Sequence, residues 1–149
     1  MIEAVVFDLD GLLLDSEQLW DEAREQLARE RGGRWPLGLA SSSNRELIDL
    51  ALELMGIAER FKATVSSEEV ARGKPAPDVY LEAARRLGVD PERAAAVEDS
   101  ENGILAAKAA GMRAIAIPNR HFPPGEAALA RADVVLHSLA DLTPEAVEP

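Results

Sequence analysis

Acidic side chains form two closely spaced pairs, Asp8 with Asp10 and Glu98 with Asp99. Two unscreened carboxylates about 4 Å apart repel one another by roughly 4 kcal/mol at an effective dielectric near 20, so the four cannot share a pocket without a cation. A ligand set made only of oxygen atoms, without His or Cys, favours a hard ion. Mg²⁺ prefers a few carboxylates together with water and substrate phosphate. We therefore expect Mg²⁺, and not Zn²⁺, at a site that these residues share.

Groups that can bind phosphate stand at two further positions. Lys74 lies in a Gly-Lys-Pro sequence, and its ammonium group can neutralise anionic oxygens. Ser41 and Ser42 begin a polar run after an apolar segment, where the hydroxyl group and the backbone amides of a helix start suit phosphate oxygens. Together with the carboxylates, these groups indicate phosphoryl-transfer chemistry.

One aspartate of such a site can act as a nucleophile. Its carboxylate can attack phosphorus in line, because the cation and Lys74 neutralise the negative charge that otherwise repels it. An aspartyl phosphate is the product. Its formation and release require protonation of the leaving oxygen and then activation of water, and Asp10, two residues after Asp8, is placed for both steps.

Short apolar segments precede these residues and are predicted to be strands. They cover residues 4–7, 36–40, 63–66, 95–97, 113–117 and 133–137, and helical periodicity occurs at 16–31, 46–54, 78–87 and 103–110. This alternation predicts an α/β fold, a three-layer Rossmann-like parallel sheet with helices on both faces. In such sheets ligands bind beyond the carboxyl ends of the strands, which is where the candidate residues lie.

Composition narrows the class of protein. The 149 residues fit one domain, 1–149, and carry a formal net charge of −11. This charge argues against nucleic acid and anionic membranes as partners. The chain has no cysteine and no apolar run long enough for a signal peptide or a membrane span, so we expect a cytoplasmic protein.

Four segments, in order, resemble the motifs of the haloacid dehalogenase-like (HAD) phosphatases. The first is Phe7-Asp8-Leu9-Asp10-Gly11-Leu12-Leu13-Leu14-Asp15-Ser16-Glu17. The others are Leu39-Ala40-Ser41-Ser42-Ser43, Gly73-Lys74-Pro75-Ala76-Pro77-Asp78, and Val97-Glu98-Asp99-Ser100 with Asn102-Gly103 and Ala109-Ala110-Gly111-Met112. The sequences of these motifs are most similar to those of the β-phosphoglucomutase-like branch, which includes many phosphatases of small metabolites.

The resemblance implies a role for each residue. Asp8 would be the nucleophile and Asp10 the acid and base, with Ser41 and Lys74 on phosphate. Asp8, Asp10 through its carbonyl group, Glu98 and Asp99 would surround Mg²⁺. A small phosphorylated molecule is the implied substrate. Members that cleave carbon–halogen bonds lack an acidic residue at the place of Asp10, so the resemblance implies a phosphatase.

One departure from the branch concerns its helical cap, which is inserted between the first and second motifs. Only residues 9–40 lie between Asp8 and Ser41, so the cap is expected to be absent or reduced to the helix at 16–31. A closing cap excludes water and grips the leaving group, so we expect weak and broad hydrolysis without it. The surface left by the missing cap is also expected to allow self-association.

Two alternatives to an active phosphatase stay open at this point. The chain could be a cap-deleted core, engineered or natural, that binds Mg²⁺ and phosphate without appreciable turnover. It could also be a receiver-like phosphoacceptor domain, although receivers are phosphorylated on an Asp after the third strand and no Asp stands beside 64–67.

Overall fold

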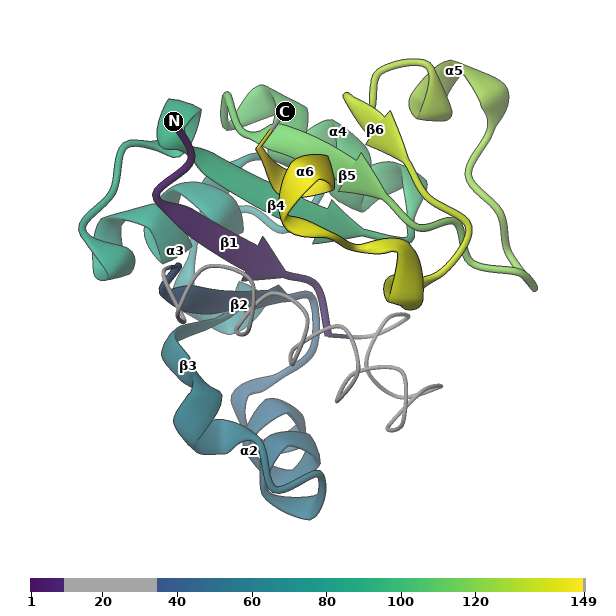
Figure 1. The fold of residues 1–149 in the computed structure, drawn as a ribbon. Coiled ribbons are helices and arrows are strands. Elements are labelled where there is room, and N and C mark those ends of the chain that lie inside the picture. Colours follow the sequence, from purple (N-terminus) through teal and green to yellow (C-terminus); the bar gives the residue numbers. More distant parts are fainter. Residues whose placement is uncertain (10–34, 149) are drawn as a thin grey trace.

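The computed structural model describes residues 1–9 and 35–148, and within them six strands form one parallel sheet (Figure 1). The strands are β1 (Ala4–Phe7), β2 (Leu37–Ser41), β3 (Phe61–Ser66), β4 (Ala94–Glu98), β5 (Arg113–Ala116) and β6 (Val134–Val135). They lie in the order β3-β2-β1-β4-β5-β6, with each neighbouring pair parallel. The direction of the strand order reverses between β1 and β4, and this is the point at which sheets of this kind bind ligands.

Helices cover both faces of the sheet and make it the middle of three layers. They are α2 (Arg45–Leu54), α3 (Asp78–Leu87), α4 (Glu101–Ala109), α5 (Glu126–Leu129) and α6 (Pro144–Val147), with short 3₁₀ turns η1 (Ala58–Arg60), η2 (Ser67–Glu69), η3 (Pro91–Arg93) and η4 (Leu139–Asp141). One core cluster joins the sheet to α3 and α4, and a second joins it to α2, η4 and α6. In Figure 1, α6 lies in front of the sheet and α4 behind it.

The central strand shows why the sheet is buried on both faces. In β1, the side chains of Val5 and Phe7 pack toward α2 and α6, whereas Val6 packs toward α3 and α4. This alternation follows from the two-residue repeat of a strand. The face toward α3 and α4 is built largely from alanine, including Ala96 and Ala114, and such small side chains let the two helices approach the backbone of the sheet closely.

The predicted α/β class, with a parallel sheet and helices on both faces, is confirmed. Strand and helix ends differ by up to two residues from the predicted ranges, and β6 is shorter than expected. Two four-residue helices, α5 and α6, escaped prediction because so short a segment has no readable 3.6-residue period. The helix predicted at 16–31 lies outside the described residues. A single domain stays a prediction.

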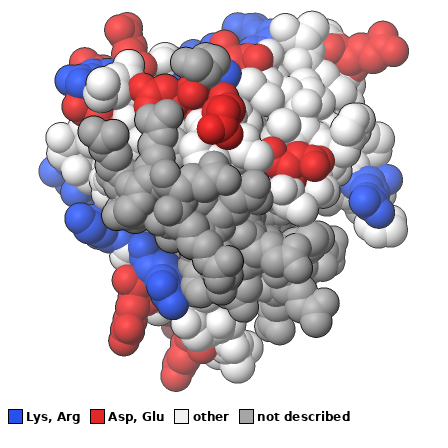
Figure 2. All heavy atoms as spheres, in the orientation of Figure 1, with Lys and Arg blue, Asp and Glu red and all other residues white. Residues whose placement is uncertain are grey.

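Charged side chains are dispersed over the described part of the face that Figure 2 shows. On the face seen in Figure 2, lysine and arginine residues of the described part stand between acidic ones and are not gathered in one patch. Over residues 1–9 and 35–148, every helix is too short or too polar to cross a membrane.

Candidate active site

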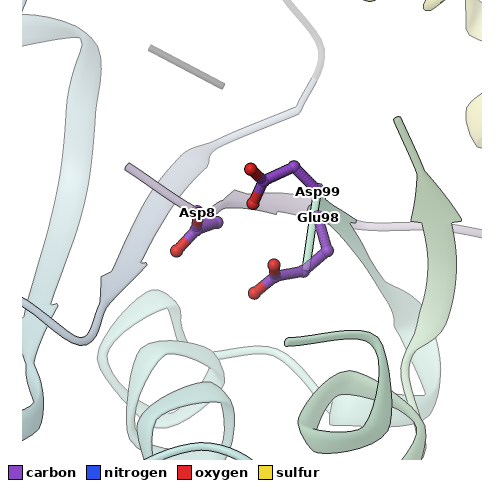
Figure 3. Close-up of side chains that lie close together, drawn as sticks. All are labelled: Asp8, Glu98 and Asp99. Carbon is purple, nitrogen blue, oxygen red and sulfur yellow. The ribbon is translucent and has the colours of Figure 1, made fainter. Parts of the chain in front are cut away.

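Three carboxyl groups meet at the carboxyl ends of β1 and β4. Asp8 follows β1, Glu98 ends β4 and Asp99 comes next. Because β1 and β4 are paired in register, and the backbone N–H of Asp8 donates to the carbonyl oxygen of Val97 at 3.0 Å, Asp8 is fixed beside Glu98. All three side chains are buried, and one carboxyl oxygen from each lies within 4.8 Å of the others (Figure 3).

Lys74 brings a positive charge to this acidic cluster. Its Nζ atom donates to Oδ1 of Asp8 at 2.8 Å, to Oε1 of Glu98 at 2.5 Å and to the carbonyl oxygen of Ala40 at 3.1 Å. Burial alone would lower the pKa of Lys74, but the negative charges of Glu98 and Asp8 outweigh it and hold this pKa above its ordinary value. The ammonium group is therefore charged at neutral pH.

Glu98 is the most enclosed member of the cluster. Its Oε1 atom accepts a second hydrogen bond, at 2.5 Å, from the hydroxyl group of Tyr80, and Oε2 accepts from Ser100 at 3.3 Å. Gly103 of α4 stands against its carboxyl group, where a Cβ atom would overlap with it. Burial raises the pKa of Glu98 even though Lys74 acts in the opposite direction.

Asp99 is held by two hydrogen bonds from Asn119. Asn119, in the loop after β5, donates from Nδ2 to Oδ2 of Asp99 at 3.1 Å. The backbone N–H of Asn119 also donates to the carbonyl oxygen of Asp99 at 3.2 Å. Burial raises the pKa of Asp99, and the negative charge of Asp8 acts in the same direction, while the bond from Asn119 lowers it.

The charges of the cluster do not balance, and this makes the donor set suitable for Mg²⁺. When ionised, three buried carboxylates face one buried ammonium group, and uncompensated buried charge is costly. The donors are all oxygen atoms, as Mg²⁺ prefers. Asp8 and Asp99 could hold the ion directly. Oε1 of Glu98 is engaged by Lys74 and Tyr80, so Oε2 is the oxygen atom of Glu98 better placed to contribute.

A cavity of about 500 Å³ opens beside the cluster. Its described lining consists of Asp8, Ser42, Lys74, Asp99, Ser100, Glu101, Asn102, Asn119 and Phe122. A phosphate group placed in this cavity would therefore meet a carboxylate, an ammonium group and hydroxyl groups at once.

The two serine residues at the end of β2 that are predicted to bind phosphate lie in different surroundings. Ser42 is exposed and lines the cavity, whereas Ser41 is fully buried, is not among the described lining residues, and accepts from the amide of Ser43 at 3.0 Å. Asn44 caps α2 by accepting from the amide of Leu47 at 2.8 Å. The roles of Ser41 and Ser42 on phosphate stay predictions.

The structure thus brings Asp8, Ser42, Lys74, Glu98 and Asp99 to one edge of the sheet. Asp10 lies outside the described residues, so its place in the site is not described.

Several site residues escaped the sequence argument. Asn119 and Phe122 follow β5, so the rule about carboxyl ends of strands, applied to that strand as well, would have found them. Tyr80 offered no such signal, since its position on the buried face of α3 is that of an ordinary core residue.

Comparison with protein-family models finds a match to the haloacid dehalogenase-like hydrolases over residues 18–111. The chain belongs to this family. It is similar to hexitol phosphatase B of Escherichia coli K12, with 36% identity over 143 residues, and to β-phosphoglucomutase of Bacillus subtilis, with 41% identity over 109 residues. These relatives place it in the β-phosphoglucomutase-like branch.

The HAD chain is shorter than these relatives. The alignments include 96% of it but 64% of hexitol phosphatase B, and 73% of it but 45% of β-phosphoglucomutase. It thus spans less than two thirds of either relative. Among solved structures, CbbY of Rhodobacter sphaeroides in complex with phosphate has a TM-score of 0.80 and 25% identity, with all of both chains covered. A HAD family hydrolase of Deinococcus radiodurans with bound phosphate and sodium has a TM-score of 0.75 and 27% identity over 99% of this chain and 98% of that one.

Proposed function

We propose that this HAD protein is a Mg²⁺-dependent phosphomonoester hydrolase that forms an aspartyl phosphate on Asp8. The observation that carries the proposal is the buried contact of Lys74 with both Asp8 and Glu98, at the end of an open cavity. This arrangement supports the proposal, because phosphoryl transfer of this kind needs a carboxylate nucleophile, a cationic phosphate ligand and a group of metal ligands close together. Named relatives support it, including hexitol phosphatase B and a probable pseudouridine-5'-phosphatase of Drosophila melanogaster.

In the first step, a carboxylate oxygen of Asp8 forms a bond to phosphorus as the bond from phosphorus to the ester oxygen breaks. Lys74, which holds Oδ1 of Asp8, limits the rotation of this carboxylate and balances charge on the incoming phosphate. Mg²⁺, when bound, would supply further charge neutralisation of the phosphate and the nucleophile. The leaving oxygen takes a proton, for which the family resemblance implies Asp10.

In the second step, water attacks the phosphorus atom of the aspartyl phosphate. The bond to Asp8 breaks, inorganic phosphate leaves and the Asp8 carboxylate is restored. The proton of the attacking water passes to Asp10, which was left unprotonated by the first step, so the protein returns to its starting state.

A small phosphorylated molecule is the proposed substrate, as the names of the relatives support. We expect weak and broad activity, because the sequence leaves no room for a cap between the first and second motifs to close over the leaving group. Self-association and a cytoplasmic location stay predictions.

The test is phosphate release from an aryl phosphate by the full chain, with Mg²⁺ titrated against EDTA. Asp8→Asn should abolish metal-dependent release. Asp90→Asn, a conservative change at the N-terminal capping residue of the 3₁₀ turn η3, should leave the release unchanged. Trapping of phosphate on the protein from a labelled substrate, lost in Asp8→Asn, would identify the intermediate. Equal release from the parent and Asp8→Asn would rule out Asp8 as the nucleophile.

A core that binds without turnover is the second candidate, favoured by the short interval between the first two motifs. It predicts that Mg²⁺ and phosphate raise the melting temperature while no phosphate is released. Family membership and motif order argue against the receiver-like alternative, because β3 ends at Ser66 without an Asp beside it.

A further inference from the structure

The described lining of the cavity beside Asp8 is polar or charged except at one residue. Phe122 is the only hydrophobic side chain among the described lining residues, and it is 84% exposed. A phenylalanine ring left in solvent beside a phosphate-binding cavity offers apolar surface that a bound molecule can cover. Asp8 and Lys74 are the proposed phosphate-contacting residues of this cavity, so we expect the rest of a substrate to extend toward the other lining residues, Phe122 among them.

The backbone that carries Phe122 is tied to the catalytic cluster through Asn119. Oδ1 of Asn119 accepts from the backbone N–H of His121 at 2.9 Å and from that of Phe122 at 3.1 Å. The same side chain donates from Nδ2 to Asp99. The side-chain amide of Asn119 therefore binds Asp99 through its nitrogen atom and the backbone of Phe122 through its oxygen atom. These bonds hold the backbone of Phe122 at a fixed place relative to Asp99.

The neighbouring rim of the cavity carries negative charge. Glu101 lines the cavity, and its Oε2 atom accepts from the backbone N–H of Gly125 at 3.3 Å, which holds the carboxylate at the rim. A leaving group with an anionic group of its own would be repelled there, whereas an uncharged one would not.

We propose that Phe122, positioned by Asn119, contacts the leaving group of the substrate. It thereby selects uncharged leaving groups that have a flat apolar face close to the ester oxygen. This inference rests on the proposed phosphatase function and names the substrate class for that site. A ring stacked on Phe122 gains contact area and an aromatic pairing that a polyol cannot supply.

Two substrates with leaving groups of similar basicity, benzyl phosphate and glycerol phosphate, separate this effect from chemical reactivity. We expect the parent to prefer benzyl phosphate in kcat/KM by about two- to tenfold, the range typical of one aromatic pairing. Phe122→Ala should abolish the preference and Phe122→Leu should retain only part of it. Leu54→Ala, which trims an apolar side chain 75% exposed on α2, should leave the ratio unchanged.

Asn119→Ala tests the positioning role. It should lower kcat for both substrates, because Asp99 loses a donor, and it should also lower the benzyl-to-glycerol ratio, because the ring is no longer held. A fall in kcat with an unchanged ratio would show that Asn119 serves Asp99 alone and would overturn its role in selectivity.

Binding measurements keep the inference independent of turnover. Calorimetric titration should show tighter binding of benzylphosphonate than of methylphosphonate to the parent, and no difference in Phe122→Ala. If this preference is found without hydrolysis of either ester, the proposed phosphatase function is wrong and the proposed role of Phe122 is supported. If the parent hydrolyses both esters with equal efficiency, or if Phe122→Ala keeps the preference, the proposed role of Phe122 is wrong. The phosphatase function is then still supported by the hydrolysis.

Discussion

The hydroxyl group of Tyr80 donates a hydrogen bond of 2.5 Å to Oε1 of Glu98, in the fully buried space between α3 and the end of β4. The ring of Tyr80 also lies under the Lys74 ammonium group, whose Nζ atom is 5.0 Å from the ring centroid. One side chain from the core of α3 therefore touches both the anion and the cation of the site. Through these contacts Tyr80 directs Oε1 of Glu98 toward Lys74 and leaves Oε2 on the side of Ser100.

Tyr80→Phe removes this hydroxyl group and keeps the ring. We expect the free energy of unfolding to fall by about 1.5–3 kcal/mol, as for loss of a buried hydrogen bond to a charged group. The Mg²⁺ concentration for half-maximal activity should rise, because Glu98 is less firmly oriented, while KM for an aryl phosphate changes little. Urea denaturation and a Mg²⁺ titration of activity measure the two effects. Leu81→Ala, at a partly exposed position on the same helix, is the matched control for stability.

A variant that lost stability with an unchanged Mg²⁺ dependence would show that Tyr80 only packs the core. The KM value serves as the internal reference, since Lys74, the proposed phosphate ligand, keeps its contact with Asp8 in Tyr80→Phe.

Lys74→Met removes the one ammonium group that contacts both Asp8 and Glu98 and leaves the buried carboxylates to repel each other. The free energy of unfolding should fall by roughly 3 kcal/mol or more, as for breaking a buried ion pair. Phosphate release should fall by about 10²-fold or more, because a cationic phosphate ligand is lost. Urea denaturation with and without Mg²⁺ tests a further consequence. Mg²⁺ should stabilise Lys74→Met more than the parent, since it then supplies the missing positive charge.

Lys62→Met, which removes an exposed charge from β3, controls for the change in net charge. Equal stabilisation of Lys74→Met and the parent by Mg²⁺ would mean that the ion does not bind near Lys74.

Sequence reasoning predicted the sheet because its strands are apolar segments that end at chemically distinctive residues. Asp8 and Asp99 could be assigned to one edge since parallel strands carry their carboxyl ends to the same side. What sequence could not supply is the contact between distant helices and the site. The hydrogen bond from Tyr80 to Glu98 depends on how α3 docks on the sheet, and no local pattern encodes it.

The same limit applies to the serine run and the loop after β5. Whether Ser41 or Ser42 lines the cavity depends on the direction in which β2 ends, and the sequence of three serines does not distinguish them. Asn119 connects Asp99 to Phe122 through one amide group, a link that exists only once the loop is folded.

Gly103 is required by the close approach of α4 to Glu98. A glycine inside a helix normally costs about 0.5–1 kcal/mol relative to alanine, so alanine here would stabilise the chain if space allowed. A Cβ atom at this position would overlap with the fully buried carboxyl group of Glu98, so α4 or Glu98 would have to shift. We therefore expect Gly103→Ala to lower the free energy of unfolding by about 1–3 kcal/mol, as overpacking does, and to reduce Mg²⁺-dependent activity.

Thermal denaturation and the activity assay measure both effects. Ala109→Gly, at an exposed position of the same helix, gives the plain cost of a glycine in α4 for comparison. A more stable Gly103→Ala with full activity would show that Glu98 has space to withdraw and would weaken its assigned place in the site.

Asp133 gives the protein a pH-dependent element remote from the catalytic cluster. Its Oδ2 atom accepts from Lys108 of α4 at 2.7 Å and from the backbone N–H of Ala114 in β5, also at 2.7 Å. Burial acts to raise the pKa of Asp133, but these two donors outweigh it and hold the pKa below its ordinary value of 3.8. A carboxyl group with a lowered pKa in the folded state stabilises the protein above its ordinary pKa, and this contribution is lost as the pH falls through the lower folded value.

Asp133→Asn keeps an oxygen acceptor for Ala114 and removes the charge, so it should behave as the parent does in strong acid. At pH 7 we expect the variant to be less stable by on the order of 1 kcal/mol, because the ion pair of Asp133 with Lys108 is partly exposed and its attraction is screened by solvent. The difference should shrink below about pH 4 and vanish when Asp133 of the parent is protonated, because the folded pKa lies below the ordinary value. Urea denaturation at a series of pH values measures it, with Glu59→Gln as an exposed-carboxyl control. A stability difference independent of pH would mean that the asparagine disturbs the contact of β5 with the loop before β6 by its shape and not by its missing charge.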